Sequence, residues 1–319
     1  MFEEIIKKIE QYESIVIFGH RNPDGDCFGS QVALKAILKE HYPHKNVVCA
    51  GSGLPIFEEI LGETDYVPAS MVEVSLAIII DCNDLERVEE KTVYEALDYA
   101  KIDHHIDTFT FKEGPQVVDE RSSSTAELIY RLAKENNFVI PYQAAMGLYL
   151  GLYTDTGRFQ YAFDYVRMFD IAKDLIKLGA EPTRITGLLN RSPISSLKIK
   201  QFIYNHYVKD PAGLIYVIAT KDDCKELQIT SANMTSNTSL IGHINNYPIW
   251  FIACETASGG MQVEMRSEGT TGINVQKVAV SFGGGGHKYA AGFTIDEFSQ
   301  KNIDRLIDLL KKALNKREN

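Results

Sequence analysis

Apolar and polar residues follow one another along the first half of the chain in blocks that predict strands and helices in alternation. Apolar runs at 14–19, 46–50 and 75–81 predict strands, and a helical pattern over about 29–40 separates the first two. Residues 76–80 are all apolar, which is typical of a strand covered on both faces. This order predicts an α/β fold whose N-terminal part is a doubly wound, mainly parallel sheet.

The pattern changes further along the chain. A short predicted strand at 99–103 is followed by helical segments that continue to about 187, and the segment 190–193 interrupts them. The rest of the chain predicts a smaller domain of mixed α/β type. Its expected strands are 213–220, 249–255 and 260–266, and its expected helices are 274–282 and 299–316.

Length and composition predict two globular domains. A chain of 319 residues exceeds a typical domain of roughly 100–200 residues. We expect a first domain at 1–189, a linker at 190–200 and a second domain at 201–319. The apolar runs are far shorter than the roughly 20 residues of a membrane-spanning helix, and residues 1–13 predict an amphipathic helix rather than a signal peptide. These features predict a cytoplasmic protein.

Charge and cysteine content narrow the class of partner. The net charge of −10 argues against a protein that binds long nucleic acid, because such proteins usually have a basic surface. Phosphate substrates remain compatible with this charge if divalent cations neutralise some of the carboxylates. The five cysteines are scattered without a CxxC pair, so we expect free thiols.

The segment FGHRNPDGD leaves the first predicted strand and enters a turn before a helix. It contains His20, Asp24 and Asp26, with Pro23 and Gly25 shaping the turn. Open α/β sheets bind ligands at this end of their strands, so the three polar side chains are candidate metal ligands. The alternative is a polar turn with Asp26 as the N-cap of the helix.

Further candidates follow later elements of the same predicted domain. Asp81 ends the most apolar strand, where an unpaired carboxylate would be costly to bury, and this favours a metal ligand. His104 and His105 end the next candidate strand, and Asp155 ends an apolar helical segment. Taken alone, surface histidines and helix caps would explain them. Taken together, these groups are numerous enough to hold two cations.

These motifs resemble, in order and spacing, the four motifs of the DHH phosphoesterase superfamily: HRNPDGDCFGS, IIIDCND, DHH at 103–105 and YTDTGRF. The resemblance implies a two-metal centre in which Asp81 bridges both ions. It also implies that His105 faces the substrate phosphate and that Asp103 orients a ligand histidine. The implied ligands are His20, Asp24 and Asp81 for one metal, and Asp26, Asp81, His104 and Asp155 for the other.

The expected cofactors are two divalent cations. Oxygen ligands with two histidines favour manganese, because imidazole is a poor ligand for magnesium; Mg²⁺ or Co²⁺ are the alternatives. Two such cations acidify a water molecule and stabilise charge on phosphoryl oxygens, so hydrolysis of a phosphate ester is the expected reaction. A covalent protein intermediate is not expected, because no convincing Ser/His/Asp or Cys/His triad is present.

A glycine cluster opens the motif GGGGHKYAAG in the second half. It is not a Walker A loop, because Tyr289 follows Lys288 where Ser or Thr is required; a flexible loop is the alternative. The motif resembles that of the DHH-associated (DHHA1) domain, which implies that His287 lies near the scissile phosphate and Arg266 binds a terminal phosphate. The candidate substrate-binding residues are Arg266, Gly284, Gly285, Gly286 and His287.

Both halves together resemble the nanoRNase and pAp phosphatase subfamily. This implies cleavage of very short RNA or DNA and linear dinucleotides, and dephosphorylation of 3′-phosphoadenosine 5′-phosphate (pAp). The expected partners are small nucleotides, with neither long nucleic acid nor membrane, and a homodimer is compatible with the sequence. One alternative is a manganese-dependent inorganic pyrophosphatase, although no Arg-Lys-Lys type run is present. The other is a nucleotide-binding regulatory module, although every metal position is filled.

Overall fold

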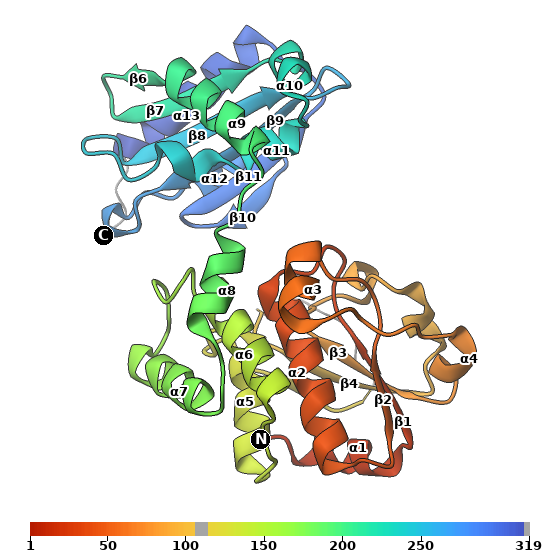
Figure 1. Cartoon of the computed structure of the whole chain (residues 1–319). Coiled ribbons are helices and arrows are strands. Elements are labelled where there is room, and N and C mark those ends of the chain that lie inside the picture. Colours follow the sequence, from red (N-terminus) through yellow and green to blue (C-terminus); the bar gives the residue numbers. More distant parts are fainter. Residues whose placement is uncertain (106–113, 316–319) are drawn as a thin grey trace. The chain divides into compact units, whose positions relative to one another are not determined.

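The computed structural model describes residues 1–105 and 114–315, and the chain divides into two compact units, Met1–Arg191 and Ser192–Asn319. Each unit combines a sheet with helices, as the sequence predicted (Figure 1). Helix α9 (Ser195–His206) belongs to the second unit and begins inside the segment 190–200 that we expected as a linker.

The first unit is built on a five-stranded sheet in which all neighbouring strands are parallel, with the order β2-β1-β3-β4-β5. This confirms the parallel sheet predicted from the apolar runs. The edge strand β5 was not predicted, because its three residues carry too little pattern. The strands are β1 (Ser14–Phe18), β2 (Asn46–Cys49), β3 (Leu76–Ile80), β4 (Asp98–Asp103) and β5 (Gln116–Val118).

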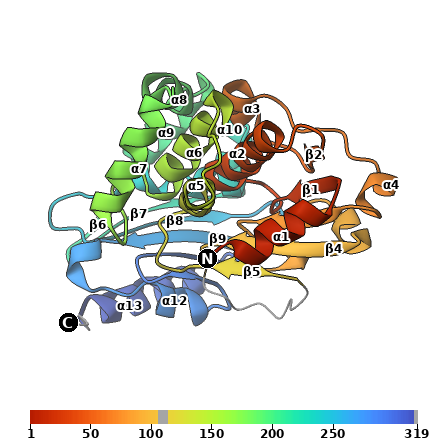
Figure 2. The same cartoon turned by 90° about the horizontal axis from the view of Figure 1, so that it is seen from below.

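Helices and short turns cover both faces of this sheet. Ile15 and Ile17 of β1 belong to the core beneath α2, α5 and α6, which lie side by side (Figures 1 and 2). Val16 and Phe18 belong to a second core, formed with α4 and the 3₁₀ turns η1 (Leu85–Arg87) and η2 (Lys91–Glu95). The helices are α1 (Glu3–Gln11), α2 (Gly25–His41), α3 (Pro55–Leu61), α4 (Ala69–Val72), α5 (Thr125–Glu135), α6 (Tyr142–Asp155), α7 (Tyr165–Lys177) and α8 (Pro182–Leu189).

Helices α2 and α6 approach each other closely because glycines face one another between them. A Cβ atom on Gly29 would lie 2.3 Å from the carbonyl oxygen of Gly147, and one on Gly151 would lie 2.6 Å from Asp26 Oδ1. Only glycine leaves room for these contacts. The packing brings the first turn of α2, with Asp26, next to the last turns of α6, which ends at Asp155.

The second unit contains a mixed six-stranded sheet with the order β10-β11-β9-β8-β7-β6, in which only β7 and β8 pair in parallel. Helices α12 and α13 pack on one face, and α9 and α10 on the other (Figure 2). Helix α11 contributes Met234 to the same core as α9 and α10. The strands are β6 (Val208–Asp210), β7 (Leu214–Ala219), β8 (Ile249–Glu255), β9 (Met261–Ser267), β10 (Gly285–His287) and β11 (Ala290–Ile295). The remaining helices are α10 (Lys221–Leu227), α11 (Ser231–Thr235), α12 (Gln276–Val280) and α13 (Gln300–Asn315), with short 3₁₀ turns η3 (Thr238–Ile241) and η4 (Gly269–Thr271).

The helices and the cysteines of the described residues bear on two further expectations, the absence of a membrane-spanning helix and the presence of free thiols. Within residues 1–105 and 114–315, no helix combines the length and the apolar character needed to cross a membrane. The five cysteines, all in the described ranges, are buried and form no disulfide, as expected.

Candidate metal centre

The turn after β1 gives its two carboxylates different partners. Asp24 is the N-cap of α2, since its Oδ1 accepts hydrogen bonds of 3.0 Å from the backbone N–H groups of Asp26 and Cys27. Asp26 is therefore not the cap that the alternative interpretation made it. Its two buried oxygens accept hydrogen bonds from the backbone N–H groups of Thr125 (2.7 Å) and Ala126 (2.9 Å), the first residues of α5. A helix N-terminus favours such a negative charge.

Asp81 follows β3 directly and has a left-handed backbone conformation with φ of 53°. This conformation is uncommon for residues other than glycine and persists only where surrounding contacts hold it. Its backbone N–H donates to the carbonyl oxygen of Ile102 (3.1 Å), and its Oδ1 accepts a hydrogen bond from Thr125 Oγ1 (2.9 Å). We did not predict Thr125 as part of the site, because a run of hydroxyl residues such as 122–125 is typical of the start of a helix.

The ring of His104 lies among three carboxylates. Its Nε2 atom is 3.2 Å from Asp155 Oδ2, 3.6 Å from Asp81 Oδ1 and 3.9 Å from Asp26 Oδ2. This nitrogen is buried and has no hydrogen-bond partner among the described residues, whereas Nδ1 faces the carbonyl oxygen of Ser122 at 3.3 Å. Buried polar atoms in native proteins normally have a partner. A cation held between Nε2 and the carboxylate oxygens would supply one.

His105 is held by a different carboxylate. Its Nδ1 lies 2.8 Å from Asp103 Oδ1, which also accepts a 3.1 Å hydrogen bond from the His105 backbone N–H. Asp103 raises the pKa of His105 to about 9, although burial acts in the opposite direction. Asp103 therefore orients His105, which is two residues further along the chain. The ring of His104 has a different neighbour, the carbonyl oxygen of Ser122. The expected role of Asp103 in orienting a ligand histidine stays a prediction, because His105 is itself one of the potential ligands.

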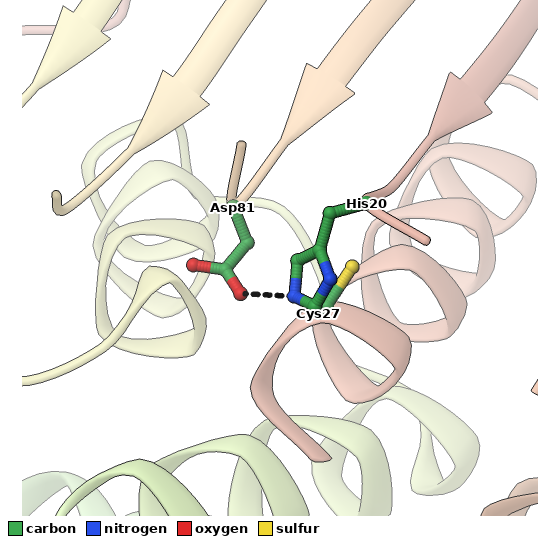
Figure 3. A group of neighbouring side chains, drawn as sticks. All are labelled: His20, Cys27 and Asp81. Carbon is green, nitrogen blue, oxygen red and sulfur yellow. Dashed lines mark ion pairs between the residues drawn. The ribbon is translucent and has the colours of Figure 1, made fainter. Parts of the chain in front are cut away.

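His20 approaches Asp81 from the neighbouring strand β1. Its Nε2 lies 3.6 Å from Asp81 Oδ2 and 4.0 Å from Asp24 Oδ1. Figure 3 shows the Asp81 carboxylate directed at this ring, with the thiol of Cys27 beside it. Potential ligand atoms of His20, Cys27 and Asp81 lie within 4.8 Å of one another. Burial raises the pKa of the Cys27 thiol, and a protonated thiol is a poor metal ligand, so His20 and Asp81 are the stronger candidates.

Negative charge accumulates where α2, β3 and α6 meet. Burial and then the charges of Asp81 and Asp155 raise the pKa of Asp26 well above its usual range. Burial, together with Asp81 and Asp24 and against the effect of His104, raises the pKa of Asp155 to about 6. Carboxylates that repel one another in a buried site need a counter-ion, and a divalent cation is suited to this role.

Two groups of potential ligands share His104. The ligand atoms of Asp26, His104 and Asp155 lie within 4.8 Å of one another, and so do those of Asp81, His104 and His105. Carboxylate and imidazole donors fit a divalent first-row metal. Asp24 belongs to no such group among the described residues, although its Oδ1 is near His20. The structure therefore brings together the expected side chains of four motifs that are far apart in the sequence.

Four of the five expected substrate-binding residues line a pocket of about 540 Å³ in the second unit. Arg266 of β9 and His287 of β10 line it together with Gly285 and Gly286, because β10, β11 and β9 are neighbours in the sheet. Gly284 is not among the lining residues; a Cβ atom there would lie 2.3 Å from the carbonyl oxygen of Gly292. Gly284 therefore lies against β11, and its expected contact with substrate stays a prediction.

Glu264, one of several lining residues that we did not predict, brings a negative charge to this pocket. Glu264 Oε2 lies 2.9 Å from Arg266 Nη1, which also donates a 3.0 Å hydrogen bond to the carbonyl oxygen of Met265. Residues two apart on a strand share a face, so the VEMR sequence contained the signal for this ion pair. The pocket thus offers a cation, Arg266, that is already oriented by a carboxylate.

Comparison with known proteins places this geometry in a family. The chain matches the model of the DHH family, N-terminal domain, over residues 14–152 and that of the DHHA1 domain over residues 214–316. A bifunctional oligoribonuclease and PAP phosphatase NrnA from Mycoplasma genitalium is 34% identical over 317 residues, covering 98% of this chain and 97% of the relative. A probable protein of the same name from Streptococcus mutans is 31% identical over 291 residues, covering 91% and 92%.

A solved structure extends the similarity to the fold. The crystal structure of an exopolyphosphatase-related protein from Bacteroides fragilis matches with a TM-score of 0.84 at 21% identity, covering 99% of this chain and 97% of that one. The matched domains coincide with the unit that contains the carboxylate and histidine motifs and with the unit that contains the glycine motif. The chain therefore belongs to the DHH family of phosphoesterases and carries a DHHA1 domain in its second unit.

Proposed function

We propose that this protein hydrolyses short oligoribonucleotides and linear dinucleotides to mononucleotides and removes phosphate from pAp. Relatives at 34% and 31% identity bear the names oligoribonuclease and PAP phosphatase, which supports these substrate classes. The observation that carries the proposal is the position of His104 Nε2, a buried atom within 3.9 Å of three carboxylates from three different elements.

Membership of the DHH family implies the use of divalent cations, and the described residues offer groups that can bind them. We assign His20, Asp24 and Asp81 to one ion and Asp26, Asp81, His104 and Asp155 to the other. Manganese suits this mixture of carboxylate and imidazole donors. When bound, two such ions lower the pKa of a water molecule and neutralise charge on the phosphoryl group.

The protein's own residues then orient the substrate. Asp103 orients His105 through the 2.8 Å contact between Oδ1 and Nδ1, which leaves the other ring nitrogen of His105 to contact the substrate phosphate. In the second unit, Arg266 provides a planar guanidinium for a terminal phosphate, and His287 and the backbone of Gly285 and Gly286 line the same pocket. Both pAp and 5′-phosphorylated dinucleotides carry a terminal phosphate that a guanidinium can bind.

The net charge of −10 supports small substrates over long nucleic acid, since long polymers are normally attracted by a basic surface. The pyrophosphatase alternative shares the metal motifs and differs in the second unit. It predicts turnover of inorganic pyrophosphate and no action on nucleotides. A direct comparison of substrates therefore separates the two functions.

The test is a parallel assay of the purified protein with added Mn²⁺ against four substrates: pAp, a 5′-phosphorylated dinucleotide, a long single-stranded RNA and pyrophosphate. We expect phosphate from pAp, mononucleotides from the dinucleotide, and much slower cleavage of the long RNA. Turnover of pyrophosphate alone would contradict the proposal.

A further inference from the structure

The carbonyl group of Ser122 is the neighbour of His104 on the side away from the carboxylates. His104 Nδ1 lies 3.3 Å from this carbonyl oxygen, while Nε2 faces Asp155, Asp81 and Asp26. A histidine binds a metal through the nitrogen that carries no proton, and an acceptor beside the other nitrogen holds the proton there. The place of the Ser122 carbonyl therefore decides which nitrogen of His104 is free.

Asp119 holds Ser122 in place through both its backbone carbonyl and its carboxylate. The backbone N–H of Ser122 donates to the carbonyl oxygen of Asp119 (2.9 Å), and Ser122 Oγ donates to Asp119 Oδ2 (3.0 Å). The other oxygen, Oδ1, accepts a hydrogen bond from the backbone N–H of Arg121 (3.1 Å). Asp119 thus binds the turn 119–122 at three points, and its own backbone N–H donates to the carbonyl oxygen of Asp103 at the end of β4 (3.2 Å).

Arg131 of α5 completes this cluster. Its Nη1 donates to Asp119 Oδ2 (2.8 Å) and to Ser122 Oγ (3.3 Å), so one guanidinium contacts both residues. The side chains of Asp119 and Arg131 are 22% and 23% exposed, while Ser122 is buried. An ion pair that is mostly shielded from water and shares a hydroxyl group with the turn restrains it more than an exposed pair would.

We propose that Asp119 and Arg131 are positioning residues for metal binding: they fix the Ser122 carbonyl, which keeps the proton of His104 on Nδ1 and leaves Nε2 free for a cation. The inference rests on the proposed function in one respect, the role of His104 as a ligand. Among the described residues, neither Asp119 nor Arg131 forms a hydrogen bond or ion pair with the carboxylates around His104 Nε2. Their effect on the metal is indirect, through the turn and the imidazole.

Another partly buried carboxylate of the first unit, Asp98, provides a matched control for Asp119. Asp98, the first residue of β4, also forms an ion pair, with Lys8, and accepts a hydrogen bond from Tyr12. Its side chain is 20% exposed, close to the value for Asp119. Replacement of either carboxylate removes one partly buried ion pair from the first unit. Only Asp119 is connected to His104.

The experiment titrates the metal-free full-length protein with Mn²⁺ by calorimetry and records thermal unfolding of the same samples. For Asp119→Ala we expect Mn²⁺ to bind about tenfold more weakly, the lower end of the range for residues that orient metal ligands. At saturating Mn²⁺ the turnover of the dinucleotide should return to within about twofold of the original protein. For Asp98→Ala we expect unchanged affinity for Mn²⁺ with a similar loss of thermal stability.

Arg131→Lys keeps a positive charge but loses the forked contact, and its affinity should fall between those of Asp119→Ala and the original protein. Equal Mn²⁺ affinity in Asp119→Ala and Asp98→Ala would overturn the inference, whatever the substrate. If Asp119→Ala is too unstable to purify, Asp119→Asn gives the same comparison. His104→Ala checks the underlying assignment, because unchanged Mn²⁺ stoichiometry and affinity would refute the ligand role itself. Failure of the original protein to cleave nucleotides would refute only the proposed substrates.

Discussion

Thr125 Oγ1 donates a 2.9 Å hydrogen bond to Asp81 Oδ1, so the first residue of α5 contacts the carboxylate at the end of β3. The backbone N–H of the same residue binds Asp26 Oδ2 at 2.7 Å. Thr125 therefore holds the carboxylates of Asp26 and Asp81, which are 55 residues apart in the sequence. The backbone contact survives any substitution except proline, whereas the hydroxyl contact depends on the side chain.

Replacing Thr125 by valine tests that hydroxyl group, because valine has nearly the same shape. A hydrogen bond to a charged group contributes about 1.5–3 kcal/mol, so we expect roughly a tenfold or greater rise in the Mn²⁺ concentration that gives half-maximal activity. Thr125→Ser retains the hydroxyl and should stay within about threefold of the original protein. Equal Mn²⁺ requirements for the valine and serine variants would show that the contact with Asp81 is unimportant.

Thr125 also shows where inference from the sequence ends. A run of hydroxyl residues such as 122–125 is typical of the start of a helix, and Ser124 caps α5 by accepting a hydrogen bond from the Glu127 backbone N–H. In a capping box, Glu127 would accept a hydrogen bond from the backbone N–H of Ser124. Here Glu127 Oε2 accepts one from the backbone N–H of Ser123 instead. The contact of Thr125 with Asp81 depends on how α5 and β3 pack, which residue types alone do not reveal.

The same limit applies to the fold. The run 76–80 predicted β3 because a fully apolar segment has few alternatives, and the parallel order followed from the alternation of strands and helices. Strand β10 consists of two glycines and a histidine, residues that favour loops, and it forms only because β11 offers backbone partners. Strands β5 and β10, which the residue pattern did not predict, therefore depend on backbone pairing with β4 and β11.

Asp81→Asn should nearly abolish turnover. Asparagine tolerates the left-handed conformation that Asp81 adopts, with φ of 53°, so the backbone should remain intact. The loss of one negative charge between His20 and His104 removes the proposed bridge between the two cations. We expect Mn²⁺ at about 100 times its dissociation constant to stabilise the original protein by roughly 2.7 kcal/mol and the variant far less. Thermal unfolding with and without Mn²⁺ measures this difference, and full activity of the variant would refute the assignment.

Gly29→Ala tests the close packing of α2 against α6. The new methyl group would lie 2.3 Å from the carbonyl oxygen of Gly147, a backbone atom that cannot rotate away. Overpacking of this kind costs about 1–3 kcal/mol, which urea unfolding would detect. Gly187 of α8 provides the control, because nothing lies within 4 Å of a Cβ atom built there. Gly187→Ala should stabilise the protein by about 0.5–1 kcal/mol. Similar effects of both substitutions would contradict the helix contact.

Asp98→Asn should reduce stability in a pH-dependent way. Partial burial alone would raise the pKa of Asp98, but hydrogen bonds from Lys8, the Tyr99 backbone and Tyr12 outweigh it and lower the pKa. A carboxyl group whose pKa is lower in the folded state stabilises the protein above its unfolded pKa of about 3.9, and this contribution is lost as the pH falls. We expect the variant to be less stable by about 1–2 kcal/mol at pH 7, and this difference should shrink progressively as the pH falls below about 3.9. A constant difference across this range would exclude the ionised carboxylate as its cause.

Arg266→Ala should weaken substrate binding more than it slows the chemical step, because Arg266 lies in the second unit and the proposed cation ligands all lie in the first. A guanidinium that binds a phosphate contributes about 1.5–3 kcal/mol, so KM for a 5′-phosphorylated dinucleotide should rise roughly 10- to 100-fold. The same dinucleotide without its 5′-phosphate should show little difference between the variant and the original protein. Glu264→Gln removes the carboxylate 2.9 Å from Arg266 Nη1 but keeps the arginine, so this variant should still discriminate between the two dinucleotides. If Arg266→Ala lowered kcat equally for both dinucleotides and left KM unchanged, the terminal phosphate would have to be bound elsewhere.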